Sequence, residues 1–137
     1  MTTEEFRGFN AYGPGGEPAA SRWSDALTLF AAPEAADAAS RWERAGALFD
    51  GKDYAGAAKV LATVVEEYPE QVAPRLLLAR AYYHSAQLRR AETELRAVLD
   101  RDPVEHYAHL MLGRTLQRQG RDEEAAGALR TAAALGA

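Results

Sequence analysis

The chain has 137 residues, of which 47% are hydrophobic and 26% charged, a net charge of −4 and no cysteine. This length and composition fit one globular domain, and the absence of cysteine excludes disulfides, thiolate catalysis and cysteine-ligated metal sites. The polar, acidic start does not resemble a secretory signal and no apolar run predicts a membrane span, so we expect a cytoplasmic protein with no membrane partner.

The negative charge is concentrated near the N-terminus. Residues 1–37 contain six acidic side chains and two arginines, whereas residues 38–137 contain 14 acidic and 14 basic side chains. The body is therefore neutral and lacks the basic footprint of a nucleic-acid partner. Residues 1–20 are rich in glycine and proline, which predicts a flexible arm with acidic and aromatic side chains.

A short amphipathic helix is predicted over residues 21–32. Trp23, Leu27 and Phe30 are spaced as neighbours on one helix face. Leu27 and Phe30 lie 34 positions before Leu61 and Val64. This suggests a degenerate half-repeat that caps the N-terminal end of the repeat array. Pro33 is expected to begin the next helix, where its missing N–H costs nothing.

The rest of the chain repeats itself every 34 residues. Apolar residues follow helical spacing, interrupted by short turns, so each copy is predicted to be a helical hairpin. Two hairpins are expected to end before Pro69 and Pro103, because proline cannot continue a helix. The matching positions are Ala45, Ala79 and Gly113; Leu48, Tyr82 and Leu116; Ala57, Ala91 and Ala125; Leu61, Leu95 and Leu129; and Val64, Val98 and Ala132.

This 34-residue unit resembles the tetratricopeptide repeat (TPR). The resemblance implies an all-α fold of three hairpins in a right-handed superhelix, whose first helices line a concave groove. Arg41, Arg75 and His109 depart from the pattern, since the family has a large residue there. The third copy also lacks a closing proline and a solvating helix, so its C-terminal face is predicted to be uncapped. The three copies cover residues 38–71, 72–105 and 106–137.

Nothing in the sequence indicates catalysis or a cofactor. The glycine-rich segment at residues 13–16 follows no predicted strand and opens no predicted helix, so it reads as a linker rather than a phosphate-binding loop. His106 and His109 have a spacing that can bind metal, with Glu105 nearby, but two surface histidines explain them as well. We expect no enzyme, no metal and no cofactor.

The predicted groove is aromatic and basic. Arg80, Arg114 and Tyr83 are expected to be exposed there, whereas Trp42 and Phe49 fit the groove and the core equally well. Aromatic and arginine side chains dominate binding hot spots, and arginine can hold a carboxylate with two hydrogen bonds. The expected groove residues are Trp42, Phe49, Leu76, Arg80, Tyr83, His84, Tyr107, Leu110, Arg114, Gln117 and Arg118.

The resemblance implies a protein-interaction module, an adaptor or scaffold that holds an acidic and aromatic partner segment. The C-terminal EEVD tail of Hsp70 or Hsp90 is not expected, because positions such as Gly46, Leu77 and Met111 cannot form the polar clamp that binds it. The alternative is a structural role through homo-oligomerisation, such as a homodimer formed by the uncapped end around Leu129 and Leu135. The arm of residues 1–20 is a further candidate occupant of the groove.

Overall fold

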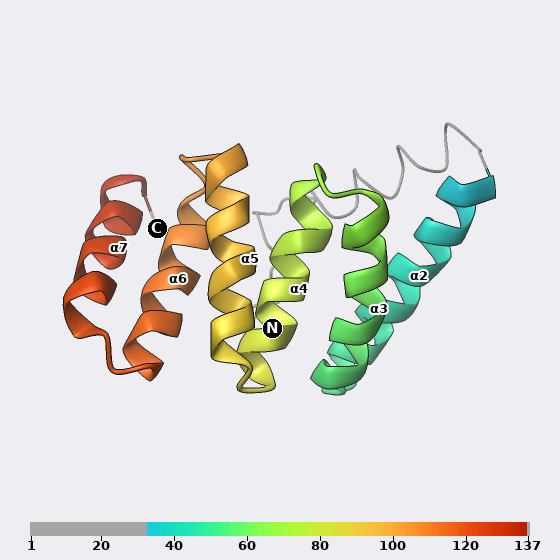
Figure 1. Ribbon diagram of the computed structural model, residues 1–137, viewed down its shortest axis with the longest axis horizontal. Coiled ribbons are helices and arrows are strands. Elements are labelled where there is room, and N and C mark those ends of the chain that lie inside the picture. The colour runs from blue at the N-terminus through green and yellow to red at the C-terminus, as the bar shows by residue number, and fades with distance from the viewer. Residues whose placement is uncertain (1–32, 137) are drawn as a thin grey trace. The chain divides into compact units, whose positions relative to one another are not determined.

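The computed structural model describes residues 33–136, and within this range every regular element is a helix. The predicted arm and capping helix lie outside the described residues. The all-α prediction is confirmed, and the first described helix begins at Pro33 as expected. The helices are α2 (Pro33–Asp50), α3 (Tyr54–Glu67), α4 (Val72–His84), α5 (Leu88–Arg101), α6 (His106–Arg118) and α7 (Asp122–Ala134), as drawn in Figure 1.

The chain divides into two compact units, Met1–Glu43 and Arg44–Ala137. In the described part of the first unit, Ala38 and Trp42 are buried. Arg41 forms an ion pair with Asp37, one helical turn earlier, with Nε 3.0 Å from Oδ2. None of the described helices has the length and apolar character needed to cross a membrane.

The turns inside the three hairpins share one geometry. The residue at the centre of each turn has a positive φ, and the backbone N–H that follows it bonds to a carbonyl five residues earlier, as in a Schellman motif. The central residues are Lys52 (67°), Ala86 (63°) and Gly120 (78°). The hydrogen bonds run from Asp53 to Leu48 (2.8 Å), from Gln87 to Tyr82 (2.8 Å) and from Arg121 to Leu116 (3.0 Å). The predicted turns are therefore confirmed, although only the third uses glycine.

The ends of the second helices also follow the prediction. Helix α3 stops at Glu67, two residues before Pro69, and α5 stops at Arg101, two residues before Pro103. The cap residue of each helix donates its N–H to a carbonyl in the last turn, at 2.9 Å and 2.8 Å. Proline therefore follows a helix end that the backbone has already closed.

Within the second unit, each helix from α3 to α7 packs against the next along the chain, and α4 also contacts α6 (Figure 1). The core between α4 and α7 contains Leu95, Val98, Leu112 and Leu116, all buried. Because the first helices α4 and α6 touch, their outward side chains form one continuous surface.

Small residues allow the two helices of a hairpin to approach closely. A Cβ atom on Gly113 of α6 would lie 2.5 Å from Cδ2 of Leu129 on α7, closer than real Cβ contacts occur. Ala79 and Ala91, the small residues of α4 and α5, are fully buried. Small residues therefore recur at these positions of the 34-residue unit because the two helices of a hairpin lie close together.

Candidate functional site

Side chains from α2, α3, α4 and α6 form a surface of rings and guanidinium groups in the second unit. We call it the aromatic–arginine surface. Its members come from the end of α2, the first residue of α3, the second half of α4 and both ends of α6. They are Phe49, Tyr54, Arg80, Tyr83, His84, Tyr107, Arg114 and Arg118.

Four rings cluster where α2, α3 and α4 meet. The ring of His84 stacks on Tyr54 with centroids 4.7 Å apart and 25° between planes. Phe49 meets both rings edge to face, at 5.1 Å from Tyr54 and 5.7 Å from His84. Tyr83 lies 5.5 Å from His84. The left-handed turn at Lys52 causes this arrangement, since it places Phe49 and Tyr54 side by side.

Two arginines pack on these rings. The guanidinium carbon of Arg118 lies 4.8 Å from the Tyr83 ring centroid, and its Nη1 donates a hydrogen bond to the Tyr83 carbonyl at 3.0 Å. The guanidinium carbon of Arg80 lies 4.9 Å from the Phe49 ring and 5.7 Å from the Tyr107 ring. Both geometries are typical of cation–π contacts.

The expectation that Arg80 is exposed is wrong, because only 4% of the residue is accessible to solvent. Its flat guanidinium group lies between a ring of α2 and a ring of α6, and burying the long stem adds apolar contact. Arg114 is exposed as predicted, and Tyr83 is half-buried. Arg80 therefore joins the first helices, whereas Arg114 faces solvent.

Two arginines of this surface, Arg114 and Arg118, are not paired with a carboxylate in the described residues. Both side chains are exposed. Partial burial lowers the pKa of His84, and the charges of Arg80 and Arg118 lower it further. Burial raises the pKa of Tyr107, although Arg80 and Arg114 act in the opposite direction. At neutral pH the imidazole is therefore uncharged, and the arginines set the sign of the surface.

The remaining predicted groove residues lie in different environments. Leu76 is 9% exposed and belongs to the core between α4 and α7, so its side chain supports the surface from below. Leu110 is half-buried and Gln117 is exposed on α6. Trp42, a residue of the first unit, is 9% exposed.

Sequence reasoning missed Tyr54. Tyr54 opens a second helix, whereas the resemblance places the groove on first helices only. The available signal was its distance from Phe49, since five residues across a tight turn bring two side chains to the same end of a hairpin.

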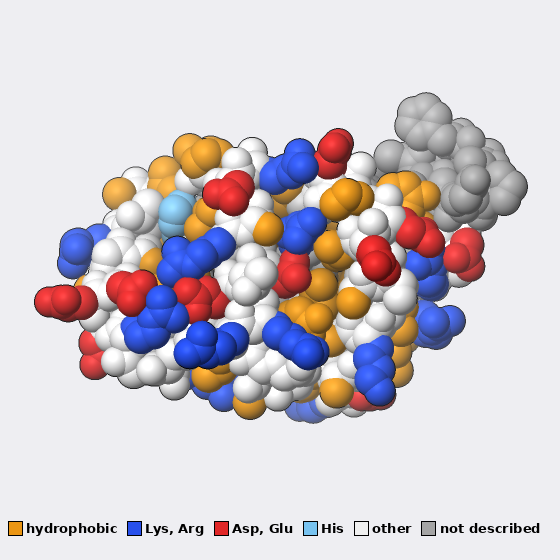
Figure 2. Space-filling view, viewed as in Figure 1, with side chains coloured by type: hydrophobic (Ala, Val, Ile, Leu, Met, Phe, Trp, Pro, Cys, Tyr) orange, Lys and Arg blue, Asp and Glu red, His pale blue; other side chains and the backbone are white. Residues whose placement is uncertain are grey.

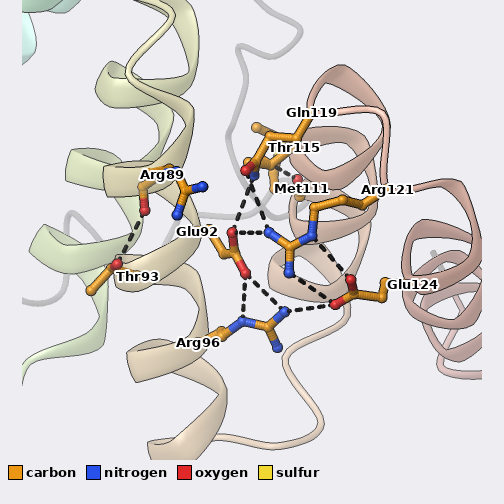
Figure 3. Close-up of polar contacts among 9 residues, drawn as sticks. All are labelled: Arg89, Glu92, Thr93, Arg96, Met111, Thr115, Gln119, Arg121 and Glu124. Atoms are coloured by element: carbon orange, nitrogen blue, oxygen red, sulfur yellow. Dashed lines mark hydrogen bonds and ion pairs between the residues drawn. The ribbon is translucent and has the colours of Figure 1, made fainter.

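A second group of arginines, which we call the Glu92 network, links α5 to α7 (Figure 3). Glu92 accepts hydrogen bonds from Arg121 (2.7 Å), Arg96 (3.0 Å) and Gln119 (3.1 Å). Arg121 also donates two hydrogen bonds to Glu124, at 3.0 Å and 2.9 Å. Here every guanidinium group faces a carboxylate.

The charges of the Glu92 network shift one another's pKa. Desolvation opposes ionisation of Glu92, but hydrogen bonds from Arg121, Gln119 and Arg96 outweigh it and hold the pKa below its ordinary value. The hydrogen bond from Arg121 likewise lowers the pKa of Glu124. Figure 2 shows one face on which Lys and Arg side chains (blue) lie next to Asp and Glu side chains (red) over α5, α6 and α7. This network therefore satisfies its own charges and fits a structural role.

The two histidines of the possible metal site have separate surroundings. Nε2 of His109 lies 2.8 Å from the carbonyl oxygen of Pro103, and His106 is exposed at the start of α6. Among the described residues, no three or more histidine or acidic side chains lie close enough together to hold a metal ion.

Comparison with known structures supports the fold. A MamA point mutant is 18% identical, with 87% of this chain and 96% of that chain covered at a TM-score of 0.70. A MamA protein from Desulfovibrio magneticus RS-1 is 24% identical, with 84% and 67% covered at a TM-score of 0.68. No curated protein sequence matches the chain. At these identities, the likeness shows a shared fold.

The family is shown by sequence. Two family models, both described as tetratricopeptide repeat, match residues 48–111 and residues 18–72. Together they span more than half of the chain, and they include two of the three turns whose geometry repeats every 34 residues. The chain therefore belongs to the tetratricopeptide repeat proteins.

Proposed function

We propose that this protein is a non-catalytic adaptor that binds an acidic and aromatic segment of a partner protein at the aromatic–arginine surface. The observation that carries the proposal is the exposure of Arg114 and Arg118, without a carboxylate in the described residues, beside a cluster of partly exposed rings. Some other arginines of the same unit, such as Arg96 and Arg121, are matched to acids in the Glu92 network.

The chemistry of this surface favours a partner with carboxylates. Arg114 and Arg118 lie one helical turn apart on α6, so their guanidinium groups can serve neighbouring carboxylates. Each can donate two parallel hydrogen bonds to one carboxylate. Positive charge on the surface also accelerates the approach of an acidic segment.

The rings favour an apolar or aromatic side chain in the same partner. Phe49, Tyr54 and Tyr83 are only partly buried, and His84 is exposed. Their edges and faces offer area whose burial contributes affinity, and ring–ring contacts add about 0.5–1.5 kcal/mol each. Because the rings already contact one another, a partner would bind without ordering them.

The alternative function is self-association through the end of the array. Leu135, just after α7, is 37% exposed and is one of two large exposed hydrophobic residues in the part of the chain that the structure describes. A second copy could cover it together with the half-buried Leu129. Light scattering of wild type and Leu135→Ser would test this: a dimer that dissociates in the variant supports assembly, and a monomeric wild type contradicts it.

The test of the adaptor function is affinity capture from native lysate, comparing three forms of the full chain. Arg114→Glu/Arg118→Glu reverses the surface charge. Arg89→Glu/Arg130→Glu makes the same change in net charge at two exposed side chains of α5 and α7, which make no ion pair or side-chain hydrogen bond within residues 37–136. Circular dichroism verifies that both variants fold.

The expected result is a partner recovered by wild type and by the α5/α7 variant, but lost with Arg114→Glu/Arg118→Glu. A partner recovered equally by all three forms would mean that another surface binds it. Equal loss from both variants would show that net charge alone governs capture, which would also contradict the proposal.

A further inference from the structure

The three repeats place different side chains at equivalent positions of their first helices, and the differences run in one direction. From α2 to α6, the side chain at each of three positions becomes more polar or more positive, with arginine already present in α4 at the first position. The three series are Gly46, Arg80 and Arg114; Phe49, Tyr83 and Gln117; and Asp50, His84 and Arg118.

The contacts show that these positions lie next to one another in the folded unit. Phe49 of α2 meets His84 of α4, with ring centroids 5.7 Å apart. Arg118 of α6 donates its hydrogen bond to the carbonyl of Tyr83, the neighbour of His84. One end of the surface therefore consists of rings, with the exposed Asp50 directly after Phe49 in the chain, and the other end carries exposed arginines.

Tyr107 of α6 does not add an exposed ring to the arginine end of the surface. Tyr107 is half-buried, with the guanidinium group of Arg80 packed against its ring. At the three compared positions of α6, the exposed side chains are Arg114, Gln117 and Arg118, none of them aromatic.

We propose that the aromatic–arginine surface is directional: a bound segment lies with its carboxylates over Arg114 and Arg118 and its aromatic or aliphatic side chain over Phe49, Tyr54 and His84. This inference rests on the proposed function and specifies the partner. The opposite orientation would bring carboxylates next to Asp50 and leave Arg114 without a counter-charge. Like-charge contacts and unpaired, desolvated charges raise the free energy of the opposite orientation, so the first orientation is preferred.

The width of the surface sets the spacing that the partner needs. Neighbouring helices pack about 8–10 Å apart, so the axes of α2 and α6 lie about 15–20 Å apart. Side chains narrow this gap, since the guanidinium carbon of Arg80 lies 4.9 Å from a ring of α2 and 5.7 Å from a ring of α6. An extended chain advances about 3.3 Å per residue. The carboxylates and the apolar side chain of the partner should therefore lie about three to six residues apart in an extended segment.

The experiment uses the full chain, labelled with ¹⁵N, and a synthetic peptide of about nine residues. The peptide has a pair of glutamates at one end, a pair of phenylalanines at the other and a glycine–serine spacer between them. One form carries a nitroxide beside the glutamates, and its twin carries the nitroxide beside the phenylalanines. Paramagnetic broadening of backbone amides then reports which end lies near which helix.

The label beside the glutamates should broaden amides of residues 114–118 more strongly than those of residues 49–54, and its twin should reverse the pattern. Replacing the glutamates with lysines should abolish binding to wild type and restore it with Arg114→Glu/Arg118→Glu, because the complementary charges are then exchanged.

Equal broadening of both regions by both labels, or the reverse pattern, would overturn the direction. It would leave the proposed function intact, because capture depends on the arginines whichever way a segment lies. Broadening confined to α5 and α7 would contradict the binding surface itself, and so the proposed function with it. No saturable shift up to about 1 mM peptide would overturn the directional proposal, because the surface is proposed to hold this chemistry.

Discussion

The aromatic–arginine surface and the Glu92 network use the same residue type in opposite ways. In the Glu92 network, Arg96 and Arg121 reach Glu92 at 3.0 Å and 2.7 Å, and the charges cancel within the molecule. In the aromatic–arginine surface, Arg118 packs on a ring at 4.8 Å and Arg114 faces solvent, with no carboxylate in the described chain opposite either of them.

The comparison shows that the neighbours of an arginine, rather than the arginine itself, indicate its role. A guanidinium group matched to buried or half-buried acceptors has little left to offer a partner. One that is held against a ring is oriented while its donors stay available. This contrast yields four predictions, ordered from the largest expected effect to the smallest.

The largest effect is expected from Glu92→Ala. The Glu92 side chain is 14% exposed and accepts hydrogen bonds from three donors, so its loss leaves Arg121, Arg96 and Gln119 short of an acceptor. We expect the free energy of unfolding to fall by about 1–2 kcal/mol, measured by urea denaturation. Asp100→Ala, on the exposed side of the same helix, is the control and should change little. A stability equal to wild type would show that the network contributes nothing net.

Salt should affect partner binding at the aromatic–arginine surface more than it affects the stability contributed by the Glu92 network. Raising sodium chloride from about 0.05 to 0.5 M should weaken partner binding about tenfold, because exposed charges are screened within a few ångströms at the higher concentration. The Tm of the free chain should change much less, since Glu92 is sheltered from solvent. Isothermal titration calorimetry and thermal melts in the same buffers measure both. Binding that is insensitive to salt would mean that the rings alone carry affinity.

Acid should weaken the fold slightly through His84. Its pKa in the folded state lies below the usual value, so the unfolded chain binds the proton more readily. This stability is therefore fully present above about pH 6.5 and is lost as the pH falls from there through the lower folded pKa. The ring is partly exposed and solvent screens the arginines, so the loss should be about 0.5 kcal/mol or less.

The measurement for His84 is the unfolding free energy of wild type and His84→Gln between pH 7.5 and 5. Only the pH dependence is compared, because removing the ring also changes packing against Tyr54. An identical slope in both proteins would show that His84 does not titrate differently on unfolding.

The smallest effect on stability is expected from Arg114→Gln. Its exposed side chain makes no hydrogen bond or ion pair within the described range, so the free energy of unfolding should stay within about 0.5 kcal/mol of wild type. Partner affinity should nevertheless fall. A large loss of stability would show that Arg114 is structural and would weaken the distinction between the two regions.

Much of the fold followed from local spacing. The 34-residue period located the helices, because small and large residues recur wherever two helices must approach or a gap must be filled. The turns were predicted from their composition, but Lys52 and Ala86 adopt a positive φ that their residue types disfavour. Helix packing on both sides of the turn imposes that conformation. A glycine at either position would have predicted the positive φ from the sequence.

The candidate site was predicted only in outline. Helical periodicity showed which residues of α4 and α6 share a face, so Tyr83, Arg114 and Arg118 were found. Whether a long side chain on that face points to solvent depends on what stands opposite it, and Arg80 is buried because rings of two other helices flank it.

The sequence by itself therefore determined the helices, their order and the family, since these depend on residues within one 34-residue unit. Only the tertiary structure decided which arginines are matched. Glu92 lies 29 positions before Arg121, and Phe49 lies 31 before Arg80, so each pairing exists only once hairpins stack. Electrostatic and ring contacts act over a few ångströms, a distance that separation along the chain does not report.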